Sequence, residues 1–416
     1  MNATLTNPAP LAPVARHERV DEMDVLRGFA LLGILLMNIE AFVGPLLTAL
    51  TGLDPALTGA DKGVDWLIYV LVQGKFMTLF SLLFGMGFAV MLERARERGS
   101  SGNGLYLRRL FVLLGFGLVH ALLIWSGDIL VPYALIGFVL WLFFRNTPVS
   151  RLPKWGVAFL LLLVIFMLLA GGAMQMAALH APEAMQAQAS EMAALLEGQR
   201  LAYGSGSYAD AVAQRGRDLG FMMTGLFFFG PMVLAMFLFG AWFWRSGAIR
   251  EVSAHLPLYR RLLWVGALVG LPLMLLSASV HPTHDVASGD VASMFWQAVA
   301  TVAGVLMCLG YASAIVLLMQ RPPWRERLLW LAPVGRMALT NYLLQSILCT
   351  LIFYGYGLGY FEQLPRAWQP LFVLAVFIAQ VLLSHWWLAR FRFGPAEWLW
   401  RALTYGRMPP MRLVAG

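Results

Sequence analysis

Apolar runs of about twenty residues recur along almost the whole chain, and they limit its fold more than any other feature. An α-helix rises about 1.5 Å per residue, so a run of this length crosses a hydrocarbon core of about 30 Å. Charged residues make up 12% of the 416 positions, roughly half the share of a soluble domain. We therefore predict an all-α fold, a polytopic transmembrane helical bundle.

The apolar runs predict about ten spans. They lie near residues 25–47, 66–92, 106–126, 129–145, 155–176, 219–244, 259–280, 291–319, 337–357 and 370–390. The stretches 66–92 and 327–357 are long enough to include helices at the membrane surface. The predicted organisation is a disordered tail over 1–20, the bundle over 21–393 and an interfacial C-terminal tail over 394–416.

The basic residues predict the orientation of the bundle. All but six of the 30 Lys and Arg residues fall on the side that holds both termini. The six exceptions are Lys62, Lys75, Arg200, Arg215, Arg217 and Arg366. Cytoplasmic segments of membrane proteins are enriched in Lys and Arg, so we expect both termini to be cytoplasmic. The net charge of +8 is therefore explained by basic residues placed at the cytoplasmic side, next to anionic lipid headgroups. It does not call for a nucleic-acid partner.

Residues 177–218 differ from the apolar runs around them. They are rich in Ala, Gln and Glu and are interrupted by Gly-Ser-Gly-Ser at 204–207. This pattern predicts two amphipathic helices around a flexible hinge, lying on the outer surface. Such a segment is either a connector or a lid over a site in the outer half of the bundle.

Three polar residues interrupt the first two predicted spans. Measured from Arg27, Asn38 lies about 16 Å and Glu40 about 20 Å into the first span. Lys75 lies near the outer boundary of the second span. Ionisable groups at this depth are costly and are candidates for function, although a Glu40–Lys75 pair could equally join two helices.

His120 and Asp128 follow in the third span and the outer turn after it. The helical rise places His120 about 16 to 18 Å beyond the arginines at 108–109. A straight helix would separate His120 from Asp128 by about 12 Å. The two side chains can therefore meet only if the turn at Ser126–Gly127 folds Asp128 back. Otherwise a different carboxylate, such as Glu40, would be the partner of the histidine.

A second polar group lies nearer the cytoplasmic side. Asn341 and Gln345 are four residues apart on one helix face, and Arg336 stands at the entrance of that span. Arg401 and Arg407 follow the last span, among tryptophans. Amides at this spacing bind substrate or a neighbouring helix. The arginines form either an interfacial anchor or a site for an anion such as a phosphate.

Several common motifs are missing from the sequence. The two histidines of "HPTHD" at 281–285 lack further ligands at defined spacing, so no metal site is predicted. No Walker motif, dinucleotide fingerprint or nucleophile elbow occurs. We expect no tightly bound cofactor and no ATP-driven transport by this chain.

Five stretches carry a family resemblance. They are "DVLRGFALLGILLMNIEAF", "GKFMTLFSLLFGMGFAVMLERA", "YLRRLFVLLGFGLVHALLIWSGDIL", "GRMALTNYLLQSILCTLIFYGYGLG" and "FGPAEWLWRALTYGRMPPMR". From about residue 19 to 412 the chain resembles the YeiB-like family of bacterial inner-membrane proteins, which implies that location. It is also distantly similar to integral-membrane acyltransferases. Those enzymes take an acyl group from cytoplasmic acyl-CoA and deliver it to an acceptor on the far side.

This chain differs from the acyltransferases at one position of their motif. Acyltransferases that modify polysaccharides carry a basic residue and a histidine in the first helix, with ten residues between them. Arg27 matches the basic residue, but Asn38 stands where the histidine is expected. An amide cannot accept a proton from a hydroxyl, so His120 would have to supply the base.

Three functions follow from these observations. The first is acyl transfer, with acyl-CoA as the candidate co-substrate and a glycan or lipid as the acceptor. The candidate catalytic residues are His120, Glu40 and Asp128. The candidate substrate-binding residues are Arg27, Asn38, Lys75, Arg109, Arg336, Asn341, Gln345, Arg401 and Arg407. The alternatives are a small-molecule or proton-coupled transporter and a non-catalytic lipid-binding protein.

Two helix faces carry glycines, at 85–87 and 115–117. Such small-residue faces could pack against another helix of the same chain or against a second copy in a homo-oligomer.

Overall fold

The computed structural model describes residues 20–97, 102–283 and 290–413, and within these ranges the fold is all-α, as predicted. The predicted tail over 1–20 lies outside the described residues except for Val20. The helices are α1 (Asp21–Val43), α2 (Gly59–Leu71), α3 (Lys75–Glu97), α4 (Asn103–Val119), α5 (Leu130–Val139), α6 (Leu152–His180), α7 (Pro182–Gly204), α8 (Tyr208–Arg245), α9 (Leu256–Val265), α10 (Leu271–Val280), α11 (Val291–Met319), α12 (Pro322–Leu328), α13 (Ala332–Arg336), α14 (Ala338–Phe353), α15 (Gln369–Leu388) and α16 (Pro395–Tyr405).

In the described ranges, eight helices are long and apolar enough to cross a membrane. The number is nine if Pro322–Arg336 and Ala338–Phe353, which are bent by 74° at Met337, form one broken span. The run predicted at 129–145 is a shorter apolar helix, Leu130–Phe144. The polytopic helical bundle is therefore confirmed, whereas the orientation of its termini stays a prediction.

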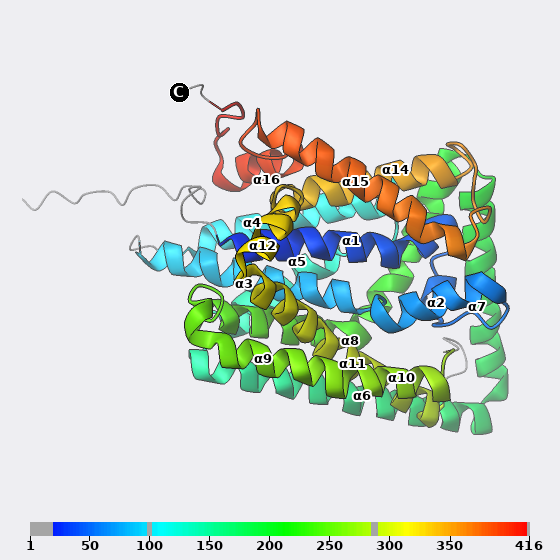
Figure 1. Cartoon of the computed structure of the whole chain (residues 1–416). Coiled ribbons are helices and arrows are strands. Elements are labelled where there is room, and N and C mark those ends of the chain that lie inside the picture. The colour runs from blue at the N-terminus through cyan, green and yellow to red at the C-terminus, as the bar shows by residue number, and fades with distance from the viewer. Residues whose placement is uncertain (1–19, 98–101, 284–289, 414–416) are drawn as a thin grey trace, which may run out of the picture.

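The long helices run side by side, and α7 lies across one end of the bundle (Figure 1). We call this the α7 end and the opposite end, which carries α16, the α16 end. The segment predicted as two amphipathic helices over 177–218 consists of the last turn of α6, α7 and the first turns of α8. The break between α7 and α8 ends at Ser207, whose side chain caps α8 in a reciprocal pair with Asp210. The second amphipathic helix is therefore continuous with a membrane-spanning one.

Glycines let α3 and α8 approach each other closely in the core. A Cβ atom at Gly240 would lie 1.9 Å from the carbonyl oxygen of Leu82. A Cβ atom at Gly85 would lie 2.1 Å from the carbonyl oxygen of Phe237. Such backbone contact is how membrane helices associate without a hydrophobic driving force. Part of the small-residue face at 85–87 thus packs within the chain.

We expect Gly240→Ala to lower the free energy of unfolding by about 1–3 kcal/mol, because the added methyl group forces α3 and α8 apart. The measurement is thermal unfolding of the purified protein in detergent. Gly115→Ala is the matched control, since it adds the same methyl group to a helix where no neighbouring atom lies within 4 Å. Equal melting temperatures for the two variants would contradict the packing described here.

Candidate functional site

His120, Asp128 and Ser346 form a hydrogen-bonded chain inside the bundle. The Nδ1 atom of His120 lies 2.8 Å from Asp128 Oδ1, and its Nε2 atom lies 2.9 Å from Ser346 Oγ. All three residues are buried. In a serine–histidine–aspartate chain of this kind, the histidine can take the proton of the serine hydroxyl. The aspartate carboxylate orients the imidazole ring and stabilises its protonated form.

A local change of helix geometry brings His120 and Asp128 together. After α4, residues His120–Ile124 form a π-helical turn, and the chain then turns before α5 begins at Leu130. The turn folds Asp128 back so that one carboxylate serves two partners. Its Oδ1 meets the histidine, and its Oδ2 accepts a hydrogen bond of 2.7 Å from the backbone N–H of Val131. The partnership that the sequence left open is therefore formed.

The sequence analysis did not identify Ser346. This residue lies eight positions into α14, about 12 Å from the start of the helix. Its position directly after Gln345 is the available signal, but serine is common in membrane helices and bonds its own backbone there. The contact with His120 depends on how α14 packs against the end of α4, which no local pattern specifies.

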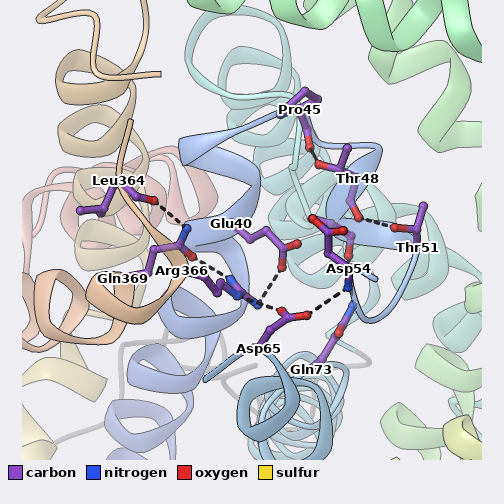
Figure 2. A network of polar contacts seen from close by, with 11 residues as sticks. Glu40, Pro45, Thr48, Thr51, Asp54, Asp65, Gln73, Leu364, Arg366 and Gln369 are labelled. Atoms are coloured by element: carbon purple, nitrogen blue, oxygen red, sulfur yellow. Dashed lines mark hydrogen bonds and ion pairs between the residues drawn. The ribbon is translucent and has the colours of Figure 1, made fainter. Parts of the chain in front are cut away.

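Glu40 is placed in a different network, near the α7 end. Figure 2 shows Arg366 between Glu40 and Asp65. Its Nη2 atom lies 2.8 Å from Glu40 Oε2, and its Nε atom lies 2.9 Å from Asp65 Oδ1. Arg366 also donates to Gln369 Oε1 at 2.7 Å. Glu40 therefore pairs with Arg366 and not with Lys75, and the carboxylate that contacts His120 belongs to Asp128.

Lys75 and Asn38 also lie away from the histidine. Lys75 is buried where α2 ends and α3 begins, and its Nζ atom donates to the carbonyl oxygen of Tyr69 at 2.8 Å. Its ammonium group thus satisfies a carbonyl at the end of α2. Asn38 is half-buried on α1, and its side-chain amide makes no hydrogen bond within the described part of the chain. Neither residue is brought to the serine.

Asn341 and Gln345 face α15. Asn341 Nδ2 donates to Ser384 Oγ at 3.1 Å, and Gln345 Nε2 donates to Gln380 Oε1 at 2.8 Å. Gln380 in turn donates to the carbonyl oxygen of Asn341 at 2.9 Å. These amides join two helices and hold α14, the helix of Ser346, against α15.

A cavity of about 280 Å³ extends into the bundle from the α16 end. Its polar lining includes five half-buried arginines, four of which the sequence analysis proposed as substrate-binding residues. The five are Arg27, Arg109, Arg336, Arg392 and Arg401. Arg407 is not among the residues that line the cavity. Arginines from four separate stretches of the sequence are therefore collected around one space.

Acidic groups also line the cavity, but they are engaged. Asp24 pairs with Arg27 at 2.7 Å. Glu397 accepts hydrogen bonds from the backbone N–H groups of Leu339 at 2.6 Å and Thr340 at 3.0 Å, at the start of α14. Burial raises the pKa of Glu397 above its usual range, and these hydrogen bonds partly oppose the shift.

Tyr342 separates the cavity from the buried histidine. It lines the cavity, and its ring centroid lies 4.9 Å from that of His120. Ile129, the neighbour of Asp128, lines the same wall. His120, Asp128 and Ser346 do not line the cavity themselves. The Ser346–His120–Asp128 chain therefore lies behind Tyr342 as seen from the cavity.

Within the described residues, no group of three or more His, Cys, Asp or Glu side chains could hold a metal ion. Part of the "HPTHD" stretch, His284 and Asp285, lies outside the described residues.

Comparison with known proteins identifies close relatives. Residues 243–407 match the family described as "Protein of unknown function (DUF418)". The chain is 36% identical to "Uncharacterized protein YxaH" of Bacillus subtilis (strain 168), over 96% of this chain and 98% of that protein. It is 35% identical to "Uncharacterized protein YeiB" of Escherichia coli (strain K12), over 93% of this chain and 96% of that protein. No solved structure matches the chain significantly.

Proposed function

Because this chain belongs to the YeiB-like family of multi-pass bacterial membrane proteins, with a DUF418 region over 243–407, we propose that it is a membrane-embedded acyltransferase. It would take an acyl group from acyl-CoA and pass it to a hydroxyl group of a glycan or lipid. The observation that carries this proposal is the Ser346–His120–Asp128 chain, which lies one aromatic ring beyond an arginine-lined cavity.

The cavity suits an amphipathic anion. Guanidinium groups bind phosphate oxygens in paired hydrogen bonds, so the arginines would hold the phosphates of the donor. Arg109 is itself held in place by the Trp400 ring, whose centroid lies 4.3 Å from the guanidinium carbon. Apolar residues such as Phe80, Leu83 and Phe84 line the same cavity and would surround the acyl chain. The Tyr342 ring must move aside for a thioester to reach the histidine.

The arginines also suggest which way the protein faces. Basic residues favour the cytoplasmic side, so the α16 end would meet cytoplasmic acyl-CoA at the bacterial inner membrane. The α7 end would then face the acceptor. There the Tyr203 hydroxyl of α7 lies 3.4 Å from Ser126 Oγ, two residues before Asp128. Helix α7 would thus serve as a lid over the acceptor side of the histidine.

A proton-coupled transporter is the second candidate, and the Glu40–Arg366–Asp65 network favours it. Two carboxylates share one guanidinium there, and buried carboxylates are common in proton relays. A non-catalytic lipid-binding protein would use the arginine-lined cavity alone. A proton relay would also use His120 and Asp128, but neither alternative gives a role to the serine hydroxyl hydrogen-bonded to that pair.

The test is release of free thiol from acyl-CoA by purified protein in lipid vesicles, with acetyl, octanoyl and palmitoyl donors. We expect release by the wild type and a loss of at least about 10²-fold in His120→Ala, since general-base catalysis contributes this much or more. His255→Ala is the matched control, because its imidazole Nδ1 lies near the carbonyl oxygen of Glu251, away from the cavity. Absence of release by the folded wild type with every donor would overturn acyl transfer, and equal rates in the two variants would overturn the assignment of His120 as its base.

A further inference from the structure

The hydroxyl of Ser346 is placed differently from an ordinary serine in a helix. Such a serine usually bonds the carbonyl oxygen four residues earlier. Ser346 Oγ lies 3.3 Å from that carbonyl, in Tyr342, but 2.9 Å from His120 Nε2. Among the described residues, no other serine hydroxyl is hydrogen-bonded to an imidazole. Its shorter contact is therefore with the group that can remove its proton.

The surroundings favour a donor and an acceptor that act in turn. The arginine-lined cavity approaches the histidine from the α16 end, through Tyr342. On another side, the ring of His120 packs against Trp125, at a centroid distance of 6.3 Å. Trp125 packs on Phe42 at 4.1 Å. A site closed in this way has little room for two large substrates to reach His120 at the same moment.

We propose that Ser346 is a nucleophile and that the acyl group rests on its Oγ atom as an ester between two half-reactions. This inference rests on the proposed acyltransferase function and adds a covalent intermediate to it. It assigns His120 to both half-reactions and Asp128 to the orientation of the His120 ring.

In the first half-reaction, His120 Nε2 takes the proton of Ser346 as Oγ bonds to the thioester carbonyl carbon. The carbon–sulfur bond breaks, and the CoA thiolate leaves as a thiol with that proton. In the second, the acceptor hydroxyl attacks the ester carbonyl while His120 takes its proton. The ester bond to Ser346 breaks, and His120 returns the proton to Oγ.

The experiment traps the ester. Wild-type protein in phosphatidylcholine vesicles, which present no free hydroxyl group as acceptor, is mixed with acyl-labelled acyl-CoA, quenched in acid and digested for mass spectrometry. Turnover is measured separately in phosphatidylglycerol vesicles, whose headgroup supplies acceptor hydroxyls. We expect one acyl group on the peptide that contains Ser346, and thiol release in a burst of about one equivalent. Ser346→Ala should lose the label and at least about 10²-fold of the turnover. Ser346→Cys should carry the label as a thioester, which neutral hydroxylamine removes more readily than the serine ester.

Ser277→Ala is the matched control, because Ser277 is also buried in a helix but donates to the carbonyl oxygen of Trp296 and bonds no histidine. It should keep both the label and the turnover. Melting temperatures of all variants show that they are folded. If Ser346→Ala turns over at the wild-type rate and the wild type carries no label, the covalent step is overturned while acyl transfer stands, with His120 acting directly on the acceptor. If the folded wild type releases no thiol even when acceptor hydroxyls are present, the proposed function fails and this inference fails with it.

Discussion

Asp128→Asn is expected to lower the turnover number for acyl transfer by roughly 10² to 10⁴-fold, while the KM for acyl-CoA stays near the wild-type value. The amide has the same shape as the carboxylate, but it lacks the negative charge that stabilises protonated His120. It can also present an N–H group to the ring and so fix the wrong tautomer. The arginines proposed to bind the donor lie outside this contact, so binding should be unaffected.

Asp128→Asn should remain folded, because asparagine can still accept the hydrogen bond from Val131 that Asp128 accepts in the first turn of α5. Asp218→Asn is the matched control. Asp218 is a buried aspartate bonded to Gln199 at 2.9 Å and to Tyr203 at 2.5 Å, without a histidine. Its replacement should affect the melting temperature more than the turnover number. Wild-type turnover in Asp128→Asn would show that His120 needs no carboxylate.

Arg366→Met is expected to lower the free energy of unfolding by about 3–5 kcal/mol, the cost of leaving buried charges without their partner. The Arg366 and Asp65 side chains are 5% and 4% exposed, and that of Glu40 is 22% exposed. Water can therefore replace little of the lost interaction (Figure 2). Thermal unfolding of the variant in detergent measures the loss.

Two further variants make this measurement specific. The triple change Glu40→Gln, Asp65→Asn and Arg366→Met removes all three charges and should recover most of the lost stability. Arg200→Met breaks the pair of Arg200 with Glu362, in which both side chains are 46% exposed, and should have little effect. If Arg366→Met melts like Arg200→Met, or if the triple variant melts no higher than Arg366→Met, the network does not stabilise the fold as described.

The sequence predicts the helices well because their signal is local. Apolar runs of sufficient length specify the membrane-spanning helices, and the long stretch at 66–92 was expected to include a surface helix. The structure divides it into α2 and α3 at Gly74, whose φ angle of 79° suits glycine. Contacts between residues on helices far apart in the sequence leave no such local signal. Glu40 pairs with Arg366, and Ser346 meets His120, because of how the helices pack, and neither pairing could be read from spacing.

The polar residues show the same difference between local patterns, which the sequence contains, and contacts between helices, which it does not. Arg27, Arg109, Arg336 and Arg401 were each singled out by charge, and the structure gathers them around one cavity. Asn341 and Gln345 were singled out by their shared helix face, and the structure uses that face to join α14 to α15. A pattern on one helix specifies which side is polar. It does not specify whether that side meets a ligand or another helix.

The hydrogen bonds of Glu397 have a practical consequence for any shortened or tagged form of the protein. The sequence predicts an interfacial tail after residue 393, and in the structure α16 of this segment supplies the carboxylate that holds the beginning of α14. It also supplies two residues of the cavity wall, Trp400 and Arg401. A truncation before Pro395 would therefore loosen the helix that carries Ser346 and open the donor cavity in one cut. A purification tag belongs after Leu413, whose backbone N–H still donates to the carbonyl oxygen of Arg390, and a shorter protein should retain α16 entire.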